Sequence, residues 1–187
     1  MSLKLAWGIT GSGDLLPETF SVMSTVKKSP DIRITAVLSK AAVKVVRWYK
    51  LWDELEHMAD HVLKEEDANT PFVVGKLQTG GFDCLLVAPA TANTVAKIVH
   101  GIADSIISNA VAQTNKVATP IYIMPVDQRG GTTITRLPGG EKLELKIRPV
   151  DIDNARKLAS MDGIRVLAGP EEIEDALKEC ARRLSAE

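Results

Sequence analysis

Three short segments of the sequence combine glycine, hydroxyl and amide groups in a way that suits a flat, phosphorylated ligand. The first is Gly8–Gly13 (GITGSG), which follows an apolar run and precedes a helical pattern. Glycines let the backbone approach an anion closely, and the first turn of a helix presents unpaired N–H groups. The spacing is neither a dinucleotide fingerprint nor a P-loop, because no G-x-G-x-x-G and no Gly-Lys-Ser/Thr occurs. Gly11, Ser12 and Gly13 are therefore candidate phosphate contacts, with an ordinary strand–helix turn as the alternative.

The other two segments follow later strand-like runs. At Ser39 and Lys40, a hydroxyl and a cation open a helical pattern, where both could meet a phosphate. The alternative is a helix cap at Ser39 beside a solvated lysine. Pro89–Thr94 (PATANT) turns an apolar run into small residues, one amide and two hydroxyls. Small residues admit a flat ligand, and Asn93 can both donate and accept. A cap alone would need one polar residue rather than three, which favours a ligand.

The elements that must position these segments alternate between strand and helix. Such alternation predicts a parallel sheet with helices on both faces, in a three-layer α/β/α arrangement. In such sheets ligands bind beyond the carboxyl ends of the strands, where all three segments fall. The expected strands are 3–9, 32–38, 82–88, 120–125 and 164–167, and the expected helices are 15–27, 41–52, 53–66, 93–100, 103–114, 151–161 and 170–184.

Residues 131–148 depart from this alternation. Two segments of alternating residues, 132–137 and 143–148, flank Pro138-Gly139-Gly140. This pattern predicts a β-hairpin inserted near the C-terminal third of the chain. With 187 residues and no internal repeat, the chain is expected to form a single domain over residues 1–187.

Composition and charge argue against several classes of function. The chain has 23 Lys and Arg against 24 Asp and Glu, a net charge of -1, so no nucleic-acid partner is expected. No apolar stretch reaches the roughly 18 residues that span a bilayer, and no signal peptide is recognisable, so a cytoplasmic location is expected. Cys84 and Cys180 are too few for a structural zinc site or an iron–sulfur cluster. Cys84 is expected to be buried, and Cys180 to be incidental on a charged helix.

Two further groups of residues have both a structural and a functional interpretation. His57 and His61 have the i, i+4 spacing of helical metal ligands, but no third ligand is evident. A solvated helix face is therefore expected there, and no metal is predicted. Trp48, Tyr49 and Trp52 lie within five positions of one another in a chain with few aromatic residues. They are either a packing anchor, including a subunit interface, or an aromatic wall for a planar ring.

Pro89–Thr94 resembles the PASANT motif of the homo-oligomeric flavin-containing cysteine decarboxylase family (HFCD), with Thr91 in place of serine. The resemblance covers roughly residues 3–128. Within that family, residues 39–42 and 45–49 make the chain most similar to archaeal flavoproteins and acceptor-dependent dihydromethanopterin reductases. The other landmarks occur in the family's order, namely the Gly11-Ser12 turn, Ser39 at a strand end, and Gly101-Ile102-Ala103-Asp104 after the motif helix.

The resemblance implies a Rossmann-like, flavodoxin-like fold that binds FMN within a trimer, sometimes assembled into dodecamers. By the same resemblance, the first segment should meet the FMN phosphate, Ser39 the phosphate or ribityl chain, and the third segment the flavin. Asp104 and Ser105 should lie near the isoalloxazine or ribityl group, from the same or a neighbouring subunit. The implied cofactor-binding residues are Gly11, Ser12, Gly13, Ser39, Lys40, Pro89, Ala90, Thr91, Ala92, Asn93, Asp104 and Ser105.

The loop Pro125–Gly131 departs from the decarboxylase branch, whose Pro-x-Met-Asn-x-x-Met pattern grips the substrate carboxylate. The Asn and the second Met are missing, and Asp127 would repel a carboxylate, although Arg129 could offset this. The leading expectation is therefore an FMN-dependent oxidoreductase. A ferredoxin-like donor would supply the electrons, because the chain has too few cysteines for its own cluster. A small planar acceptor, such as a dihydropterin, would receive them.

Three alternatives stay open. One is an FMN-dependent decarboxylase of a cysteinyl substrate, which the Pro125 loop weakens. Another is a flavin prenyltransferase, for which Arg129, Arg136 and Lys142 are the nearest candidates to hold a prenyl phosphate. The third is a non-catalytic subunit or flavin store. No catalytic residue is assigned.

Overall fold

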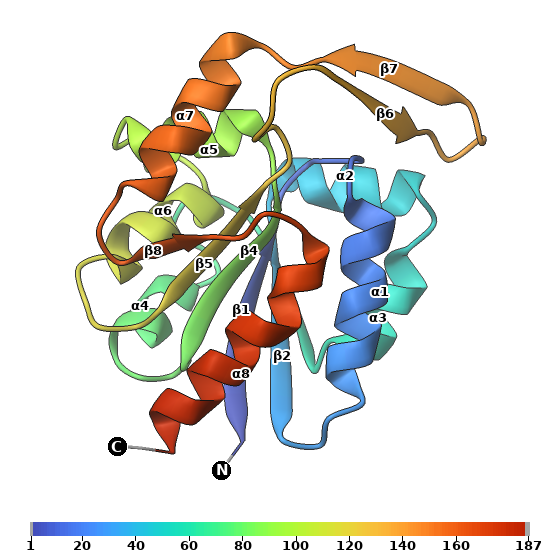
Figure 1. The fold of residues 1–187 in the computed structure, drawn as a ribbon. Coiled ribbons are helices and arrows are strands. Elements are labelled where there is room, and N and C mark those ends of the chain that lie inside the picture. The colour runs from blue at the N-terminus through green and yellow to red at the C-terminus, as the bar shows by residue number, and fades with distance from the viewer. Residues whose placement is uncertain (1, 186–187) are drawn as a thin grey trace.

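The computed structural model describes residues 2–185, which form a Rossmann-like, three-layer α/β/α fold around a parallel sheet (Figure 1). The strand order is β3-β2-β1-β4-β5-β8, and every neighbouring pair runs parallel. The predicted fold class is confirmed. The six strands are β1 (Leu3–Ile9), β2 (Ile32–Leu38), β3 (His61–Lys64), β4 (Cys84–Ala90), β5 (Ile121–Pro125) and β8 (Ile164–Val166).

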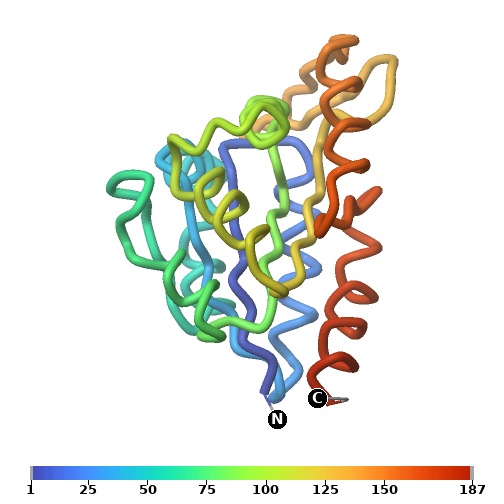
Figure 2. The backbone as a smooth tube through the Cα atoms, turned by 90° about the vertical axis from the view of Figure 1, so that its left-hand side faces the viewer, coloured from blue at the N-terminus to red at the C-terminus, as the bar shows by residue number. Residues whose placement is uncertain are grey.

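The helices divide into two layers with separate apolar cores. Residues of α1, α2, α3 and α8 pack in one buried cluster, and residues of α4, α5, α6 and α7 pack in the other. Figures 1 and 2 show these layers on the two faces of the sheet. The helices are α1 (Leu16–Lys27), α2 (Lys40–Trp48), α3 (Trp52–Met58), α4 (Val73–Gln78), α5 (Ala92–Val99), α6 (Ile106–Thr114), α7 (Pro149–Ala159) and α8 (Ile173–Leu184), with a short 3₁₀ turn η1 (Pro170–Glu172).

The central strands are apolar on both faces because each face meets a helical layer. In β1, Leu5 and Trp7 point into the core beneath α1 and α8, whereas Ala6 points into the other core. The strand period of two produces this alternation, and the double burial explains why the strand reads as a nearly continuous apolar run. Trp7 also donates from Nε1 to the carbonyl of Ala88, 2.9 Å away, and so ties β1 to the carboxyl end of β4.

The predicted β-hairpin is confirmed. Its strands, β6 (Thr132–Arg136) and β7 (Lys142–Lys146), form a separate two-stranded antiparallel sheet. The hairpin projects beyond the carboxyl ends of the parallel strands, above α2 (Figure 1). Its insertion therefore lies at the edge of the sheet where the sequence predicts a ligand.

The helix predicted over residues 53–66 is partly wrong. The chain is helical only to Met58 and then forms β3, an edge strand beside β2. Asp60 fixes this change of direction, because both its backbone N–H and its carboxylate bond to the backbone of Ile34. His57 and His61 therefore lie on different elements, and the helical spacing inferred for them does not exist. The short helix α4 was not predicted, and α6 begins at Ile106 rather than at residue 103.

The expectation that Cys180 is incidental is also wrong. It lies on the apolar face of α8 with 1% of its surface exposed, in the same core cluster as Cys84. Its thiol donates to the carbonyl of Asp83, 3.5 Å away, so α8 is anchored to the start of β4.

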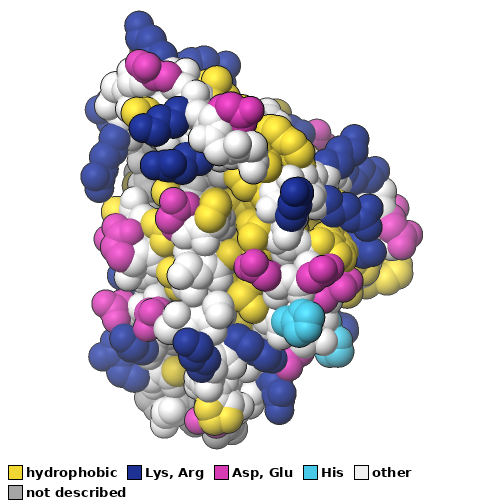
Figure 3. Space-filling view, turned by 90° about the vertical axis from the view of Figure 1, so that its right-hand side faces the viewer, with side chains coloured by type: hydrophobic (Ala, Val, Ile, Leu, Met, Phe, Trp, Pro, Cys, Tyr) yellow, Lys and Arg dark blue, Asp and Glu magenta, His cyan; other side chains and the backbone are white. Residues whose placement is uncertain are grey.

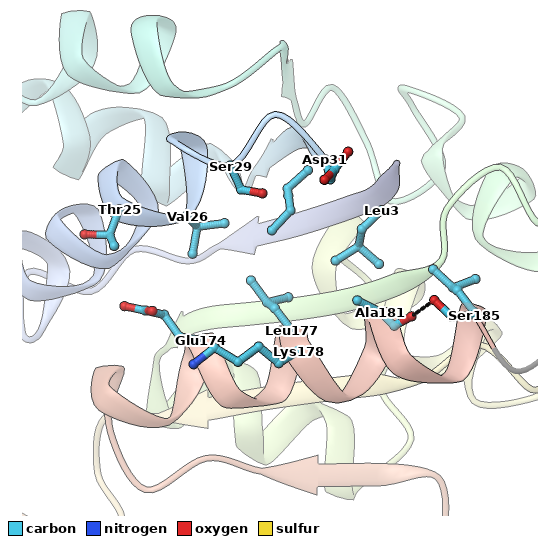
Figure 4. A pocket seen from close by; sticks show the side chains of 12 residues that line it. Leu3, Thr25, Val26, Ser29, Asp31, Glu174, Leu177, Lys178, Ala181 and Ser185 are labelled. Carbon is cyan, nitrogen blue, oxygen red and sulfur yellow. Dashed lines mark hydrogen bonds between the residues drawn. The ribbon is translucent and has the colours of Figure 1, made fainter. Parts of the chain in front are cut away.

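A groove of about 410 Å³ lies between α1 and α8, at the amino ends of the strands (Figure 4). Leu3, Val26 and Leu177 contribute apolar side chains to its walls. None of the three candidate segments lines it, since those segments follow the carboxyl ends. Among residues 2–185, no helix is both long and apolar enough to cross a bilayer.

Asp60 makes stability at this corner dependent on acid. Burial alone would raise its pKa, but hydrogen bonds from Lys27, the amide of Ile34 and Arg33 lower the pKa to about 2 from 3.8. The carboxylate therefore stabilises the fold above the ordinary pKa, and this contribution is lost as the pH falls toward 2. We expect Asp60→Asn to lower the free energy of unfolding at pH 7 by roughly 2 kcal/mol.

Equilibrium urea unfolding at pH 7 and at low pH measures this effect. The difference between Asp60→Asn and the unaltered chain should shrink as the pH approaches 2. Asp153→Asn is the control, because Asp153 makes only an exposed ion pair with Arg156 and should change stability by less than about 0.5 kcal/mol. A deficit in Asp60→Asn that stays constant with pH would contradict the assignment.

Candidate functional site

The first and third segments form one structure at the carboxyl edge of the sheet. They follow β1 and β4, which are neighbours. The hydroxyl of Thr10 donates to the carbonyl of Pro89, 2.8 Å away, and accepts from the amide of Thr91, 2.9 Å away. Thr10 is buried, with 2% exposed. Its hydroxyl is therefore a bridge between the two loops.

The glycines of the first segment allow close packing against α2. A Cβ on Gly11 would lie 2.5 Å from the Cβ of Ala41, and one on Gly13 would lie 2.4 Å from the hydroxyl of Tyr49. A side chain at Gly11 would push the loop away from α2, whereas one at Gly13 would require the Tyr49 ring to shift. Leu15, which ends the loop, has a left-handed φ of 55°, a conformation that is strained for leucine and is frequent at functional sites.

Backbone donors of this loop are available to a ligand. Within residues 2–185, the amides of Gly11, Gly13 and Asp14 donate to no acceptor. They precede α1, whose N-terminus favours negative charge. The Ser12 hydroxyl donates to the carbonyl of Asp14, 3.1 Å away, and so shapes the loop. This donor set fits a phosphate group.

The third segment caps α5 and leaves its amide side chain free. Thr91 is the N-cap, and its hydroxyl accepts from the amide of Thr94 at 3.2 Å and lies 3.0 Å from that residue's hydroxyl. Asn93 is exposed, and its side chain makes no hydrogen bond within the described part of the chain. Capping thus accounts for both threonines but not for Asn93, which can contact a ligand. Pro89 and Ala90 end β4, and Ala92 begins α5.

The second segment and the Asp104–Ser105 pair both serve as helix starts. Ser39 caps α2 by accepting from the amide of Ala42 at 3.1 Å, as the alternative interpretation expected. Ser105 caps α6 in a capping box with Ser108. Asp104 is ion-paired with Lys97 at 2.8 Å, and the hydrogen bond from Lys97 lowers the pKa of Asp104.

Glu65 joins these two helix starts, and sequence reasoning missed it. One carboxylate oxygen accepts from the amide of Lys40 at 2.8 Å, and the other accepts from the amide of Ile106 at 3.0 Å. Anions are favoured at helix N-termini, so Glu65 stabilises α2 and α6 together. Glu65 could have been identified only if β3 had been predicted, because a residue directly after that strand lies at the same edge of the sheet as the three candidate segments.

Acidic side chains surround the loop after β5. Burial raises the pKa of Asp127, and the nearby carboxylates of Asp151 and Asp14 raise it further. Gln128 fixes the loop by donating to the carbonyls of Pro125 and Leu167, each 2.7 Å away. The charge of Asp14 acts on Asp127, so the loop and the first segment share one electrostatic environment, in which Arg148, ion-paired with Asp151, partly offsets the acids.

Sequence comparison shows relatives along the whole chain. A model of the Flavoprotein family matches residues 1–182. An uncharacterized protein of Methanocaldococcus jannaschii is 52% identical over 94% of this chain and 94% of its own length. The dihydromethanopterin reductase (acceptor) of the same organism is 30% identical, over 92% of this chain and 95% of that relative.

Structural comparison agrees with this result. Burkholderia xenovorans DmrB in complex with FMN, described as a cubic protein cage for redox transfer, has a TM-score of 0.83. It is 30% identical, and the match covers 98% of each chain. Since the family model spans nearly the whole sequence and the fold agrees over the same length, this chain belongs to the Flavoprotein family.

Proposed function

We propose that this chain binds FMN at the carboxyl edge of the sheet and passes electrons from an external donor to a small planar acceptor of the dihydropterin class. The observation that carries the proposal is the pair of loops joined by Thr10, with unpaired amides on one loop and the free Asn93 side chain on the other. The named relatives, a dihydromethanopterin reductase and an FMN-bound redox protein, support the same chemistry.

Each loop has a distinct role in this proposal. The amides of Gly11 and Gly13 would hold the phosphate at the start of α1, while Ser12 keeps the loop in shape. The segment Pro89–Asn93 would lie against the flavin. When bound, FMN supplies the redox chemistry, and the protein supplies position and electrostatics. Ser39, Lys40, Asp104 and Ser105 stay proposed contacts at the same edge, from the same or a neighbouring subunit.

We further propose that the protein works as a homo-oligomer, either a trimer or a dodecamer. The cubic protein cage described for the DmrB relative supports a homo-oligomer, whereas the trimer and the dodecamer follow from the family resemblance. The electron donor is proposed to be a ferredoxin-like protein, because two cysteines cannot form a cluster of their own.

A decarboxylase or prenyltransferase function is less well supported. The half-buried Asp127, near Asp14 and only partly offset by Arg148, disfavours the carboxylate of a cysteinyl substrate. It also disfavours a prenyl diphosphate, although Arg129, Arg136 and Lys142 occur in the same region of the sequence. Electron transfer needs no second anion at this position.

The first test is cofactor binding followed by reduction. The purified protein, incubated with FMN and freed of excess by gel filtration, should show flavin absorbance that dithionite bleaches. Reduced ferredoxin should bleach it also, and a dihydropterin acceptor should then be reduced. A protein that retains no FMN would disprove the proposal, and release of carbon dioxide from a cysteinyl substrate would favour the decarboxylase.

Asn93→Ala should weaken FMN binding about tenfold, the loss expected for about one hydrogen bond, without changing the fold. Fluorescence titration of FMN measures the affinity, and circular dichroism monitors the fold. Asn115→Ala is the matched control, because Asn115 caps the far end of α6 and should leave the affinity unchanged. Equal affinities in both variants would remove Asn93 from the site.

A further inference from the structure

We propose that α2 and the β6–β7 hairpin together form the surface on which an acidic electron-carrier protein docks. This inference rests on the proposed function, because it assigns the surface through which electrons reach the flavin. We call it the basic surface. It comprises six exposed cations, namely Lys44, Arg47, Lys50, Arg136, Lys142 and Lys146.

The first observation is that these cations lack carboxylate partners. Within residues 2–185, none of the six forms an ion pair, whereas cations elsewhere, such as Lys97 and Arg165, do. The segment 32–52 contains no Asp or Glu at all. Two exposed acids, Glu141 and Glu144, lie on the hairpin among these cations, so the excess of positive charge is greatest along 32–52 and around Arg136 and Lys142. A local field of this kind attracts an anionic surface and speeds its association.

The second observation is a like-charge pair within the hairpin. Arg136 lies directly opposite Lys142 in the antiparallel register. Like charges at directly opposed positions destabilise a hairpin, and here only Glu144, on the same face two residues along β7, offsets them. All of β7 is exposed to solvent. A carboxylate-rich partner would offset the repulsion.

The third observation identifies the partner as a protein. Trp48 is 56% exposed and meets Tyr49 edge-on, with ring centroids 5.5 Å apart. Ile134 on the hairpin is 59% exposed. An exposed Trp beside a partly exposed Tyr and an Arg is the combination that carries much of the binding energy in protein interfaces. Figure 3 shows this side of the molecule, where Lys and Arg side chains lie around exposed hydrophobic ones with Asp and Glu side chains among them.

The basic surface adjoins the candidate cofactor site. The Tyr49 hydroxyl donates to the carbonyl of Arg136, 2.9 Å away, and so joins α2 to the hairpin. The same hydroxyl packs against Gly13 of the first segment, since a Cβ added to Gly13 would lie only 2.4 Å from it. A carrier docked here would therefore sit next to the proposed phosphate loop. Each carrier loses one electron, so two carriers reduce one flavin, which takes up two protons from solvent.

The test compares two triple variants that change the net charge equally. The hairpin variant is R136E/K142E/K146E. The control variant is K28E/K116E/R182E. Lys28 directly follows α1, Lys116 follows the end of α6, and Arg182 lies on α8; all three are exposed and lie near the amino ends of the strands. Stopped-flow absorbance follows reduction of FMN-loaded protein by an acidic [2Fe–2S] ferredoxin at low ionic strength. We expect the hairpin variant to be reduced at least about tenfold more slowly, and the control within about twofold of the unaltered protein.

Two further measurements separate the outcomes. Added salt should slow the unaltered protein toward the rate of the hairpin variant, since screening weakens the attraction. Photochemical reduction with EDTA should proceed equally in all three proteins, which shows that each holds a working flavin. If none of the three proteins retains FMN, the proposed function fails. In that case, calorimetric titration of ferredoxin into the flavin-free chain still tests whether the basic surface binds ferredoxin.

Equal ferredoxin rates, or equal ferredoxin affinities, in the hairpin and control variants would overturn the proposal. Sedimentation velocity measures the oligomeric state of the hairpin variant. If the hairpin variant dissociates into smaller assemblies while its ferredoxin affinity is unchanged, the basic surface is a contact between copies of this chain instead. In Trp48→Ala, we expect ferredoxin to bind at least about tenfold more weakly, as for an interface anchor.

Discussion

Gly11→Ala should abolish measurable FMN binding, with an affinity at least about 100-fold below that of the unaltered chain. The added Cβ would lie 2.5 Å from the Cβ of Ala41 and 3.3 Å from its carbonyl carbon, so the start of α2 itself must move. Overpacking of this kind costs about 1–3 kcal/mol of stability. The displaced loop would also misdirect the amides of Gly11 and Gly13. Fluorescence titration of FMN and equilibrium urea unfolding measure the two effects.

Gly75→Ala is the matched control for this substitution. Gly75 lies within α4, and a Cβ there would meet nothing within 4 Å. Alanine in a helix interior is favoured over glycine by up to about 1 kcal/mol, so this variant should be more stable and bind FMN normally. Native FMN affinity in Gly11→Ala would show that the first segment is not the phosphate site.

Thr10→Val should loosen the connection between the two loops while nearly conserving side-chain volume, since only the 3.3 Å backbone bond from the Thr10 amide to the Pro89 carbonyl would remain. The hydroxyl that joins the carbonyl of Pro89 to the amide of Thr91 would be lost. The amide would then be left without a partner, at a cost of about 1–3 kcal/mol. Because the flavin-facing segment depends on this bridge, FMN affinity should fall at least about tenfold. Thr10→Ser, which keeps the hydroxyl, should restore most of the affinity.

Thr114→Val tests whether a buried hydroxyl as such is responsible. Thr114 is fully buried, and its hydroxyl has no hydrogen-bond partner. Its replacement should therefore be neutral or stabilising, with no change in FMN affinity. A loss of affinity in Thr114→Val as large as in Thr10→Val would attribute the effect to general destabilisation and contradict the assigned bridge.

The sequence predicts the central sheet well because its strands are buried on both faces. The expected ranges 3–9 and 32–38 coincide with β1 and β2, and the hairpin follows from its Pro-Gly-Gly turn. β3 was missed because it has only four residues, lies at the sheet edge and is only partly buried. Its sequence, HVLK, then continues the apparent helical pattern of the preceding residues.

The site was predictable in its segments but not in its internal contacts. Glycine, hydroxyl and amide residues identified the first and third loops. The bridge at Thr10 joins residues 79 and 81 positions apart, and Glu65 reaches Ile106 across 41 positions. Such contacts depend on which strands become neighbours, and no local pattern encodes that. The roles of Thr10 and Glu65 therefore required the structure.

The late position of α8 in the sequence has a consequence for synthesis of the protein. Tyr122 on β5 and Cys84 on β4 belong to the core cluster that α8 completes. During synthesis, the part of the sheet that contains Tyr122 and Cys84 stays exposed from the time β5 emerges from the ribosome until α8 follows. Both candidate loops are translated before α8, so they are complete while this apolar surface is still uncovered and the unfinished chain is prone to aggregate.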